Sequence, residues 1–469
     1  MKANKPGSAV ASTSLTVALI TLGCSKNLVD AEYMSGVMAA DGMRIVEDPK
    51  AASVIVVNTC GFIDSAKKEA IATILDMADY KQDGNCDFLI VTGCMAQRYA
   101  ADIAADLPEV DAIIGTSHYN DIAKAIRRLY AEQGFAASPE QDRHLPLSWT
   151  DFDPDQTLEH LHAAGRQLST RYYAYLKLAE GCSNHCTFCA IPAIRGPQRS
   201  RPQEELLAEA ATILEQGISE LILIAQDTTA YGLDLTGHRD LPELLRKLSA
   251  MPFKRIRFLY AYPDGVTPEL LEVMASASNI LHYLDLPVQH ASDAILKRMA
   301  RKDDSAHIQK VLDLARTVMP DICLRTTVMV GFPGETDQDF NDLLAFLKAQ
   351  KFNHLGCFIF SPEEGTPASR LPDQVAAAIA QTRYNQVMET QQQILQELNP
   401  QRLNQVYTVL VESVSSDGVF YLGRCDWQAP EVDSLTHILA EKQPLELGHY
   451  YPLRIIEADN YDYTGVVES

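Results

Sequence analysis

The sequence predicts an α/β protein with three parts: an N-terminal parallel-sheet α/β domain, a central partial (β/α)6 barrel and a small C-terminal antiparallel β-barrel. Continuously apolar runs alternate with helical patterns up to about residue 107, a second such series of six units begins near residue 171, and short alternating strands follow residue 401. A chain of 469 residues is also too long for one ordinary hydrophobic core. The expected segments are a disordered lead-in over 1–14, the first domain over 15–130, a linker over 131–167, the barrel over 168–400 and the last domain over 401–469.

Composition limits the class of protein. Hydrophobic residues make up 46% and charged residues 22% of the chain, which is typical of a soluble globular protein. No apolar run approaches the roughly 18 residues that span a bilayer. The short apolar "LTVALITLG" runs directly into a patterned segment, so we expect no signal peptide and a cytoplasmic protein. In that reducing compartment, clustered cysteines are more often metal ligands or catalytic groups than disulfides.

The net charge of −22 bears on the partners of the protein. Proteins that bind nucleic-acid phosphates normally carry a basic surface. The acidic balance therefore favours a basic protein partner, or none, over free nucleic acid, and no membrane partner is expected. An acidic surface that serves only solubility explains the same charge.

Three cysteines follow the predicted strands of the first domain. The strands are "VALITLG", "SVIVVNT" and "FLIVTG", and Cys24, Cys60 and Cys94 come directly after them. Because the carboxyl ends of parallel strands meet at one edge of a sheet, where open α/β sheets bind ligands, these three thiols should converge. Cys86 precedes a strand and should lie at the opposite edge. The alternative, three unrelated buried cysteines, is disfavoured by the threefold repeat of strand, Gly or Thr, and Cys.

The central segment carries a second group of cysteines. Its candidate strands are "YYAYLKLAEG", "LILIAQD", "RIRFLYA", "LHYLDLPVQ", "CLRTTVMVGF" and "HLGCFIFS", with helical patterns between them. Cys182, Cys186 and Cys189 follow the first of these strands, in "EGCSNHCTFCAIPAIRG". In barrels of this kind the chemistry sits on loops at the carboxyl ends of the strands. Cys323 and Cys357 lie within strands and are interpreted as core residues.

The C-x3-C-x2-C spacing of the second group points to a metal. Thiolates favour zinc or iron–sulfur clusters. Three cysteines on one cubane cluster leave one iron open to a small molecule, as catalytic zinc sites leave one position open. A zinc site would need a fourth local ligand, and His185 is poorly placed for it because it adjoins Cys186.

The stretch "CSNHCTFC" resembles the signature of the radical S-adenosylmethionine enzymes. This resemblance implies a [4Fe–4S] cluster on Cys182, Cys186 and Cys189. It implies that the open iron chelates S-adenosylmethionine, which is cleaved to a radical that removes hydrogen from unreactive carbon atoms. It also suggests that polar groups at other strand ends hold the cofactor, and Gln226 and Gln289 occupy such positions.

The role of two further stretches is not decided by the sequence. "GFPGET", from Gly331 to Thr336, is a turn into a helix that could approach a ligand. Arg195, Arg199 and Arg201 follow the cysteine motif. They either face a substrate or cofactor carboxylate or form a solvated turn.

The last domain, with its "GRCDWQAPEVD", resembles the TRAM domain, which contacts nucleic acid in relatives that modify transfer RNA. From 401 to 469 it holds eleven acidic and four basic residues. That balance suits a basic protein surface better than phosphate. The alternative is a barrel that only caps the structure.

The three parts together resemble the methylthiotransferase family along nearly the whole chain. The resemblance implies a second [4Fe–4S] cluster on Cys24, Cys60 and Cys94, which presents sulfur. "GCSKNLVDAE", "YPDGVTPELLEVM", "FSPEEGTPA" and "APEVD" look like the RimO branch of that family. That branch adds a methylthio group to the β-carbon of one aspartate in protein S-twelve of the small ribosomal subunit, free or on the ribosome.

Two rival hypotheses remain from the sequence. The first is a transfer-RNA methylthiotransferase of the MiaB type, which shares the architecture; the charge balance and "APEVD" argue against it. The second is a non-catalytic iron–sulfur binding or redox-sensing module. The implied reaction also needs an electron donor and a sulfur carrier, which the sequence does not identify.

Overall fold

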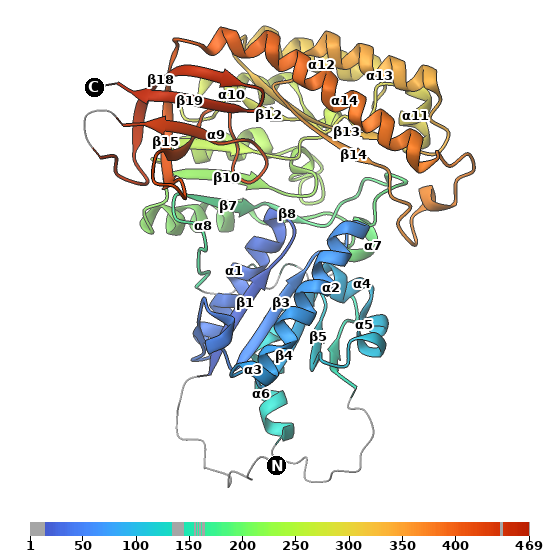
Figure 1. Ribbon diagram of the computed structural model, residues 1–469, viewed down its shortest axis with the longest axis vertical. Coiled ribbons are helices and arrows are strands. Elements are labelled where there is room, and N and C mark those ends of the chain that lie inside the picture. The colour runs from blue at the N-terminus through green and yellow to red at the C-terminus, as the bar shows by residue number, and fades with distance from the viewer. Residues whose placement is uncertain are drawn as a thin grey trace. The chain divides into compact units, whose positions relative to one another are not determined.

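The computed structural model describes residues 15–133, 145–153, 156, 158, 161, 165–440 and 444–468. The expected lead-in over 1–14 therefore lies outside the described residues. The chain forms two compact units (Figure 1). An N-terminal unit comprises residues 1–169 with 193–196, and a second unit comprises 170–192 with 197–469. None of the described helices is both long and apolar enough to cross a bilayer.

The N-terminal unit is built on one parallel sheet in the order β2-β1-β3-β4-β5-β6. The three predicted strands are its centre, and their register pairs Thr21 with Asn58 and Thr59 with Gly93. β3 and β4 are buried along their whole length, as continuous apolar runs require. The strands are β1 (Thr16–Thr21), β2 (Arg44–Ile45), β3 (Val54–Thr59), β4 (Phe88–Gly93), β5 (Ala112–Ile114) and β6 (Leu147–Trp149).

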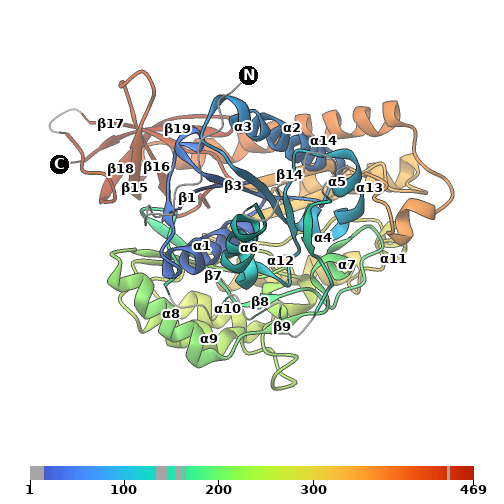
Figure 2. The ribbon, with the colours of Figure 1, turned by 90° about the horizontal axis from the view of Figure 1, so that it is seen from below.

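Helices cover both faces of this sheet (Figure 2). On one face α1 and α6 pack against alternate residues of the central strands, such as Val54 and Val56. On the other face α2 and α5 pack against the intervening residues, such as Ile55 and Val57. The helices are α1 (Ser25–Ala40), α2 (Asp64–Ala78), α3 (Tyr80–Asp83), α4 (Cys94–Arg98), α5 (Ala100–Asp106) and α6 (Ile122–Gln133).

The expected linker over 131–167 contributes to the sheet. Its residues Leu147–Trp149 form β6, which pairs in parallel with β5. Trp149 packs against the same core as α1 and α6. The sequence does not predict this strand, because its three residues lie in a polar, proline-containing segment with no sustained period.

Six parallel strands form the partial barrel of the second unit, and all six were predicted. They lie in two three-stranded pieces, β11-β10-β7 and β12-β13-β14, and a bridge between Ile256 and Ile280 joins the pieces. The strands are β7 (Tyr173–Lys177), β10 (Glu220–Ile224), β11 (Arg255–Phe258), β12 (Tyr283–Asp285), β13 (Cys323–Val330) and β14 (His354–Ile359). A short ladder of β8 (Ala179–Glu180) and β9 (Arg199–Ser200) flanks the first strand.

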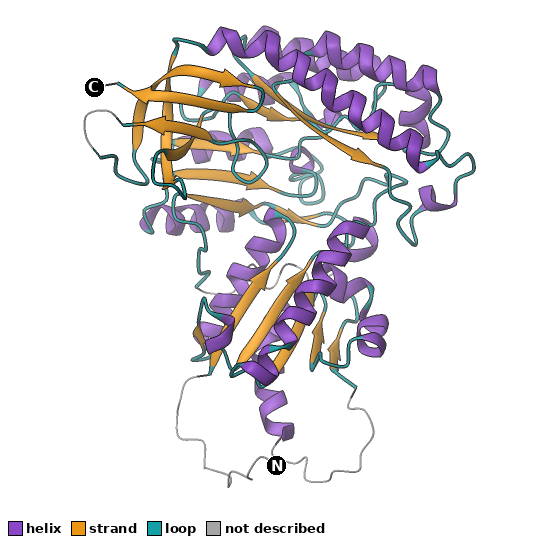
Figure 3. Cartoon of the chain, in the orientation of Figure 1, coloured by secondary structure: helices purple, strands orange, loops and turns teal. Residues whose placement is uncertain are grey.

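Helices connect these strands in the manner of βα units (Figure 3). α8 carries Leu206 and Ala210 as buried residues, and α12 carries Ile308 and Leu312. The helices are α7 (Ile191–Arg195), α8 (Gln203–Glu215), α9 (Leu241–Ser249), α10 (Pro268–Ser276), α11 (Asp293–Arg298), α12 (Ser305–Val318), α13 (Asp337–Gln350) and α14 (Ala377–Leu398).

The C-terminal residues form a closed five-stranded barrel in the order β15-β16-β17-β19-β18. Its neighbours pair antiparallel, as predicted, except for β17 and β19, which are parallel. β19 follows β18 after a two-residue turn, so the two strands do not stand out as separate alternating runs in the sequence. The strands are β15 (Val406–Val414), β16 (Tyr421–Cys425), β17 (Thr436–Leu439), β18 (Tyr450–Asp459) and β19 (Asp462–Val467).

A buried ion network joins this barrel to the amino ends of the central strands. Arg424 of β16 donates to Glu220, the first residue of β10, at 2.8 Å, and Arg257 of β11 donates to the same carboxylate at 2.8 Å. All three side chains have no exposed surface. Burial alone would raise the pKa of Glu220, but the two guanidinium groups outweigh it and hold the pKa at about 2, below the ordinary 4.5.

The motif "APEVD" belongs to the same joint. Glu431 accepts hydrogen bonds from the hydroxyls of Tyr173 and Tyr175. Asp433 accepts one from Tyr283 at 2.6 Å and pairs with Arg325 at 3.4 Å. The motif thus attaches the C-terminal barrel to the amino-terminal face of the central barrel. In barrels of this kind that face is expected to serve stability rather than chemistry.

Replacement of Glu220 should destabilise the second unit strongly. Glu220→Gln leaves two buried guanidinium groups without their shared carboxylate, for which we expect a loss of roughly 3–5 kcal/mol. Because the folded pKa lies below the unfolded one, the stabilisation is complete above pH 4.5 and disappears between pH 4.5 and about 2. The loss in free energy of unfolding is measured by urea unfolding at several pH values. A Trp149→Phe background leaves Trp427 as the fluorescent reporter. The matched control is the exposed Glu272→Gln, and equal stabilities of the two variants would contradict the prediction.

Candidate metal centres

Cys24, Cys60 and Cys94 come together at the carboxyl edge of the N-terminal sheet. Cys24 is the N-cap residue of α1, three residues beyond the end of β1. Cys60 follows β3, and Cys94 is the first residue of α4, directly after β4. These three strands are neighbours in the sheet, so parallel pairing alone carries the three thiols to one place.

Three glycines let the cysteine-bearing loops approach one another. A Cβ on Gly23 would lie 2.7 Å from the Cβ of Cys60, and one on Gly61 would lie 2.8 Å from the Cα of Met95. Gly93 has φ +95°, and a Cβ there would lie 2.5 Å from the carbonyl oxygen of Thr59. Each glycine adjoins one of the three cysteines. The three loops that carry these cysteines therefore pack so closely that a side chain at any of these glycines would collide with a neighbouring loop.

The thiols influence one another electrostatically. Burial raises the pKa of Cys60 to about 12, and the neighbouring Cys94 and Cys24 add to the rise. Burial also raises the pKa of Cys94, against the opposing charge of Arg195. Thiols whose ionisation is mutually unfavourable are suited to a cation that neutralises several thiolates at once.

Arg195 also belongs to this site, although its position in the sequence does not predict that. From the sequence it was expected to face a carboxylate of substrate or cofactor, or to lie on a solvated turn. It is instead 1% exposed, and its guanidinium donates to the Sγ of Cys94 at 3.3 and 3.4 Å. The segment 193–196 belongs to the N-terminal unit, although the sequence around it continues the second cysteine motif. Arg201 is buried and pairs with Glu209.

Cys182, Cys186 and Cys189 gather on the loop that follows β7 and β8. A turn hydrogen bond from Cys189 N to Cys186 O measures 3.0 Å, and the backbone N–H of Asn184 donates to the Sγ of Cys182 at 3.4 Å. Burial raises the pKa of Cys189 to about 12 and that of Cys182 to about 11, with further contributions from their cysteine neighbours. The three cysteines are therefore neighbours on one loop, each within electrostatic reach of another.

The rest of the motif anchors this loop. Thr187 donates through its backbone and side chain to the carbonyl oxygens of Met299 and Arg298. Phe188 packs edge-to-face on Phe332, in a small apolar cluster behind the loop. The hydroxyl of Tyr262 lies 3.7 Å from the Sγ of Cys186. These contacts explain why the residues between the cysteines are Thr and Phe.

Within the residues that the structure describes, no three Cys, His, Asp or Glu side chains are spaced to chelate one metal ion. A mononuclear zinc site requires ligands about 2.0–2.3 Å from one ion, whereas a cubane cluster accepts each cysteine on a different iron and so needs a wider set. His185 is exposed and joins neither group. Neither group of thiols is arranged as a site for a single metal ion.

Gln226 and Gln289 lie beyond the carboxyl ends of β10 and β12. Gln226 donates to Glu180 at 3.0 Å, while its own Oε1 is buried without a hydrogen-bond partner among the described residues. Gln289 has φ +70°, an uncommon conformation for this residue type. Its backbone is held by hydrogen bonds with Thr327 and Met329. An orphaned amide oxygen and a strained backbone are features that cluster at ligand sites.

"GFPGET" forms a turn at the carboxyl end of β13 that is engaged with its own chain. Glu335 accepts hydrogen bonds from the backbone of Gly331 and Phe332. Thr336 caps α13 in a reciprocal arrangement with Asp339. These contacts give the stretch a structural role.

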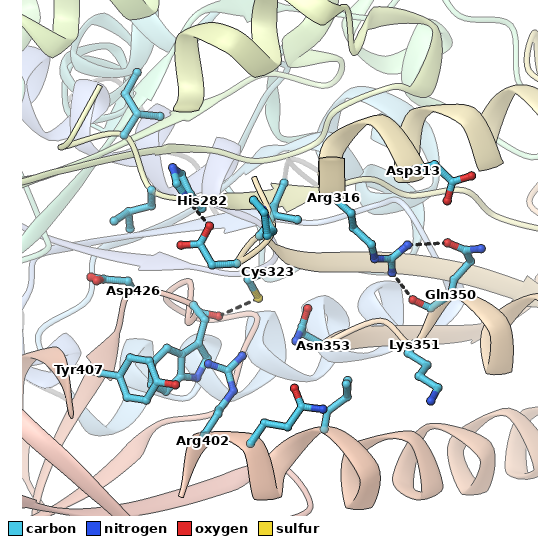
Figure 4. A pocket seen from close by; sticks show the side chains of 18 of the residues that line it. His282, Asp313, Arg316, Cys323, Gln350, Lys351, Asn353, Arg402, Tyr407 and Asp426 are labelled. Carbon is cyan, nitrogen blue, oxygen red and sulfur yellow. Dashed lines mark hydrogen bonds and ion pairs between the residues drawn. The ribbon is translucent and has the colours of Figure 1, made fainter. Parts of the chain in front are cut away.

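A cavity of about 1010 Å³ lies at the other end of the central barrel (Figure 4). Its walls include the residue at the start of β13, Cys323, together with Arg316, Arg402 and Trp427. It is at the amino ends of the strands, away from the loop that bears the cysteine motif. Cys323 is buried like Cys86 and Cys357, in agreement with the interpretation of Cys323 and Cys357 as core residues.

Comparisons with known families divide the chain in the same way. Residues 16–115 match an uncharacterized protein family designated UPF0004, residues 176–347 match the radical SAM superfamily, and residues 405–467 match the TRAM domain.

Curated relatives match over nearly the whole chain. A ribosomal protein uS12 methylthiotransferase RimO from Acetivibrio thermocellus is 45% identical over 96% of this chain and 98% of the relative. Proteins of the same name from Syntrophus aciditrophicus and Geobacter sulfurreducens are 45% and 44% identical, over 95% and 97% of this chain and 97% and 98% of the relatives. The chain belongs to the RimO family.

The fold of this RimO family member is shared with a more distant enzyme. The radical S-adenosylmethionine methyltransferase TsrM from Kitasatospora setae matches with a TM-score of 0.53 at 13% identity, over 76% of this chain and 74% of that one. At that identity the match concerns the fold alone. The family implies an iron–sulfur cluster and S-adenosylmethionine, which fits the thiols described above.

The close approach at the N-terminal thiols can be tested with two glycines of positive φ. Gly93→Ala should destabilise the N-terminal unit by roughly 2–5 kcal/mol, because φ +95° with ψ −160° strains any residue other than glycine and the added Cβ also collides with the backbone. Gly42, at φ +83°, has no atom within 4 Å of an added Cβ, so Gly42→Ala should cost only about 1–2 kcal/mol. Urea unfolding followed through Trp149, in a Trp427→Phe background, compares them; equal losses would mean that the loops do not meet as described.

Proposed function

We propose that this protein is a radical S-adenosylmethionine methylthiotransferase that acts on ribosomal protein uS12 and forms a methylthio group on the β-carbon of an aspartate. The observation that carries the proposal is the presence of two groups of three thiols, each at the carboxyl ends of parallel strands. The four remaining cysteines are buried elsewhere. The name that the relatives share supports uS12 as the substrate.

Each group of thiols has its own role in the proposal. Cys182, Cys186 and Cys189 would hold the [4Fe–4S] cluster that binds S-adenosylmethionine, and Cys24, Cys60 and Cys94 would hold a second one. When bound, the first supplies a radical that removes hydrogen from carbon, and the second supplies sulfur. Three protein ligands on each leave one position open, for the cofactor in one case and for sulfur in the other.

The protein's part is to orient and shield the cofactor. Gln226 would bind S-adenosylmethionine through its buried, unpartnered Oε1. Gln289 would present its side-chain amide from its strained position beyond the end of β12. Both lie at the strand ends that carry the cysteine loop, where barrel enzymes place their ligands.

The charge of the C-terminal barrel supports a basic protein substrate. Of its basic side chains, Arg424 is fully buried in the network with Glu220, Arg402 stacks over Trp427 and Arg454 pairs with Glu468. Several carboxylates are exposed instead, among them Glu457, Asp459 and Asp462 of the β18–β19 hairpin. This distribution disfavours phosphate contact, and hence the transfer-RNA alternative, and favours a cationic protein.

A cytoplasmic location fits the state of the cysteines. All ten lie among the described residues and are free thiols. Free thiols persist in the reducing compartment where ribosomal proteins are met. Association with uS12 on the ribosome or before assembly is compatible with this location.

Cysteine variants separate the two proposed clusters. The full chain, reconstituted anaerobically with iron and sulfide and given dithionite and S-adenosylmethionine, should add methylthio to uS12, located by tandem mass spectrometry. Cys186→Ala should form no 5′-deoxyadenosine. Cys60→Ala should still form it but leave uS12 unmodified, because only the sulfur-supplying site is lost.

Cys86→Ala, which removes a thiol at the opposite edge of the N-terminal sheet, is the control and should retain both activities. Modified uS12 from the Cys60→Ala chain would refute the second cluster. A methylthio group on transfer RNA, with uS12 unchanged, would establish the alternative substrate.

The acidic hairpin should govern capture of the substrate. The triple variant Glu457→Lys, Asp459→Lys and Asp462→Lys should raise KM for uS12 about tenfold at low salt without changing kcat, because complementary charge mainly affects encounter. The difference should shrink as salt screens the charges. Formation of 5′-deoxyadenosine without uS12 should not change.

The matched control reverses three exposed carboxylates on helices of the same unit, Glu272→Lys, Asp342→Lys and Glu389→Lys. It alters the net charge equally and should leave KM near the wild-type value. An equal rise of KM in both triple variants would show that net charge, and not this hairpin, attracts the substrate.

A further inference from the structure

The chain that carries the second cysteine motif returns to the first group of thiols. Arg195 follows Cys189 by six residues in the sequence, yet its side chain is buried in the N-terminal unit. Thr116, just beyond β5, holds this segment by donating to the carbonyl oxygen of Ile194 at 3.0 Å. The position of Arg195 is thus fixed by backbone as well as side-chain contacts.

The guanidinium of Arg195 is aimed at the sulfur of Cys94. Its Nε and Nη2 lie 3.4 and 3.3 Å from that Sγ. Nη2 also donates to Asn27 Oδ1 at 2.8 Å and to Asp30 Oδ2 at 3.0 Å. Asn27 in turn donates to the carbonyl oxygens of Leu22 and Thr59, at the ends of β1 and β3. The cysteine, the arginine and the strand ends form one hydrogen-bonded assembly.

Burial of this arginine needs a reason beyond packing. Removing a guanidinium from water is costly unless it is paired and hydrogen-bonded, and Asp30, with no exposed surface, supplies the paired charge. Arginine remains protonated, so a permanent positive charge and two donors face one thiol of the group. Net charge and hydrogen bonds to sulfur are the quantities that set the reduction potential of an iron–sulfur cluster.

We infer that Arg195 is a positioning residue of the N-terminal cluster, which fixes the Cys94 ligand and raises the reduction potential of that cluster, with Asp30 acting in the opposite direction. This inference rests on the proposed second cluster. Hydrogen bonds and positive charge at the sulfur stabilise the more electron-rich, reduced state. A negative charge at Asp30 partly offsets that stabilisation.

The measurement is the midpoint potential of the N-terminal cluster alone. In the full chain carrying Cys182→Ala, Cys186→Ala and Cys189→Ala, the remaining cluster is titrated anaerobically and its reduced form is followed by electron paramagnetic resonance. Against this parent, Arg195→Met should lower the ratio of reduced to oxidised cluster about tenfold at a fixed potential, which is about 59 mV for one electron. Asp30→Asn should shift the ratio in the opposite direction, and Arg195→Lys should fall between Arg195→Met and the parent.

Opposite shifts distinguish an electrostatic role from a merely structural one. Arg127→Met removes an exposed arginine of the same unit that pairs with Asp41, and it should leave the potential unchanged. If Arg195→Met takes up no iron, the midpoint potential of Asp30→Asn is the test. A potential above that of the parent supports the inference, and one below it contradicts the inference. Unchanged potentials in Asp30→Asn and in the Arg195 variants that take up iron would overturn it. A parent chain that binds no cluster at all would refute the proposed second cluster, and this inference with it.

Discussion

Parallel pairing of neighbouring strands is the constraint on which the functional parts of this protein depend. β1, β3 and β4 run side by side in one register, so each ends at the same edge and delivers one cysteine there. Glycine next to each of these cysteines allows the connecting loops to come within backbone contact. The same rule places the C-x3-C-x2-C loop, Gln226 and Gln289 at the carboxyl ends of the central strands. A sheet with antiparallel neighbours would scatter these groups over two edges.

The amino ends of the central strands serve a different purpose. There Glu220, Arg257 and Arg424 form an ion network without solvent exposure, and "APEVD" contributes Glu431 and Asp433 to the same joint. A joint of this kind is sensitive to loss of one partner, because the remaining charge stays buried. The C-terminal barrel is thereby attached at the end of the central barrel opposite the cysteine loop, and the carboxylates of its β18–β19 hairpin are exposed.

Much of this arrangement could be predicted because it depends on local patterns. Continuous apolar runs identified β1, β3, β4 and the six central strands, and the position of a cysteine after a strand was enough to predict which thiols converge and that Cys86 does not join them. Two strands escaped: β6 lies in a polar, proline-containing segment with no sustained period, and β19 follows β18 too closely to appear as a separate run. The parallel pairing of β17 with β19 also has no signal in the sequence, because strand direction in a closed barrel is set by closure.

The sequence by itself determined the chemistry of the protein: six cysteines at two kinds of spacing, an acidic surface and three successive patterns of strand and helix. These are local properties, since a residue's type and its distance from a strand end do not depend on the rest of the fold. Only the tertiary structure decided which distant side chains meet. Arg195 follows Cys189 by six residues in the sequence but lies against Cys94, Asn27 and Asp30 in space. "APEVD" contacts strands that begin 150 to 258 residues earlier. Contacts of this kind arise from burial and charge pairing between segments that share no sequence period. No pattern along the chain therefore predicts them.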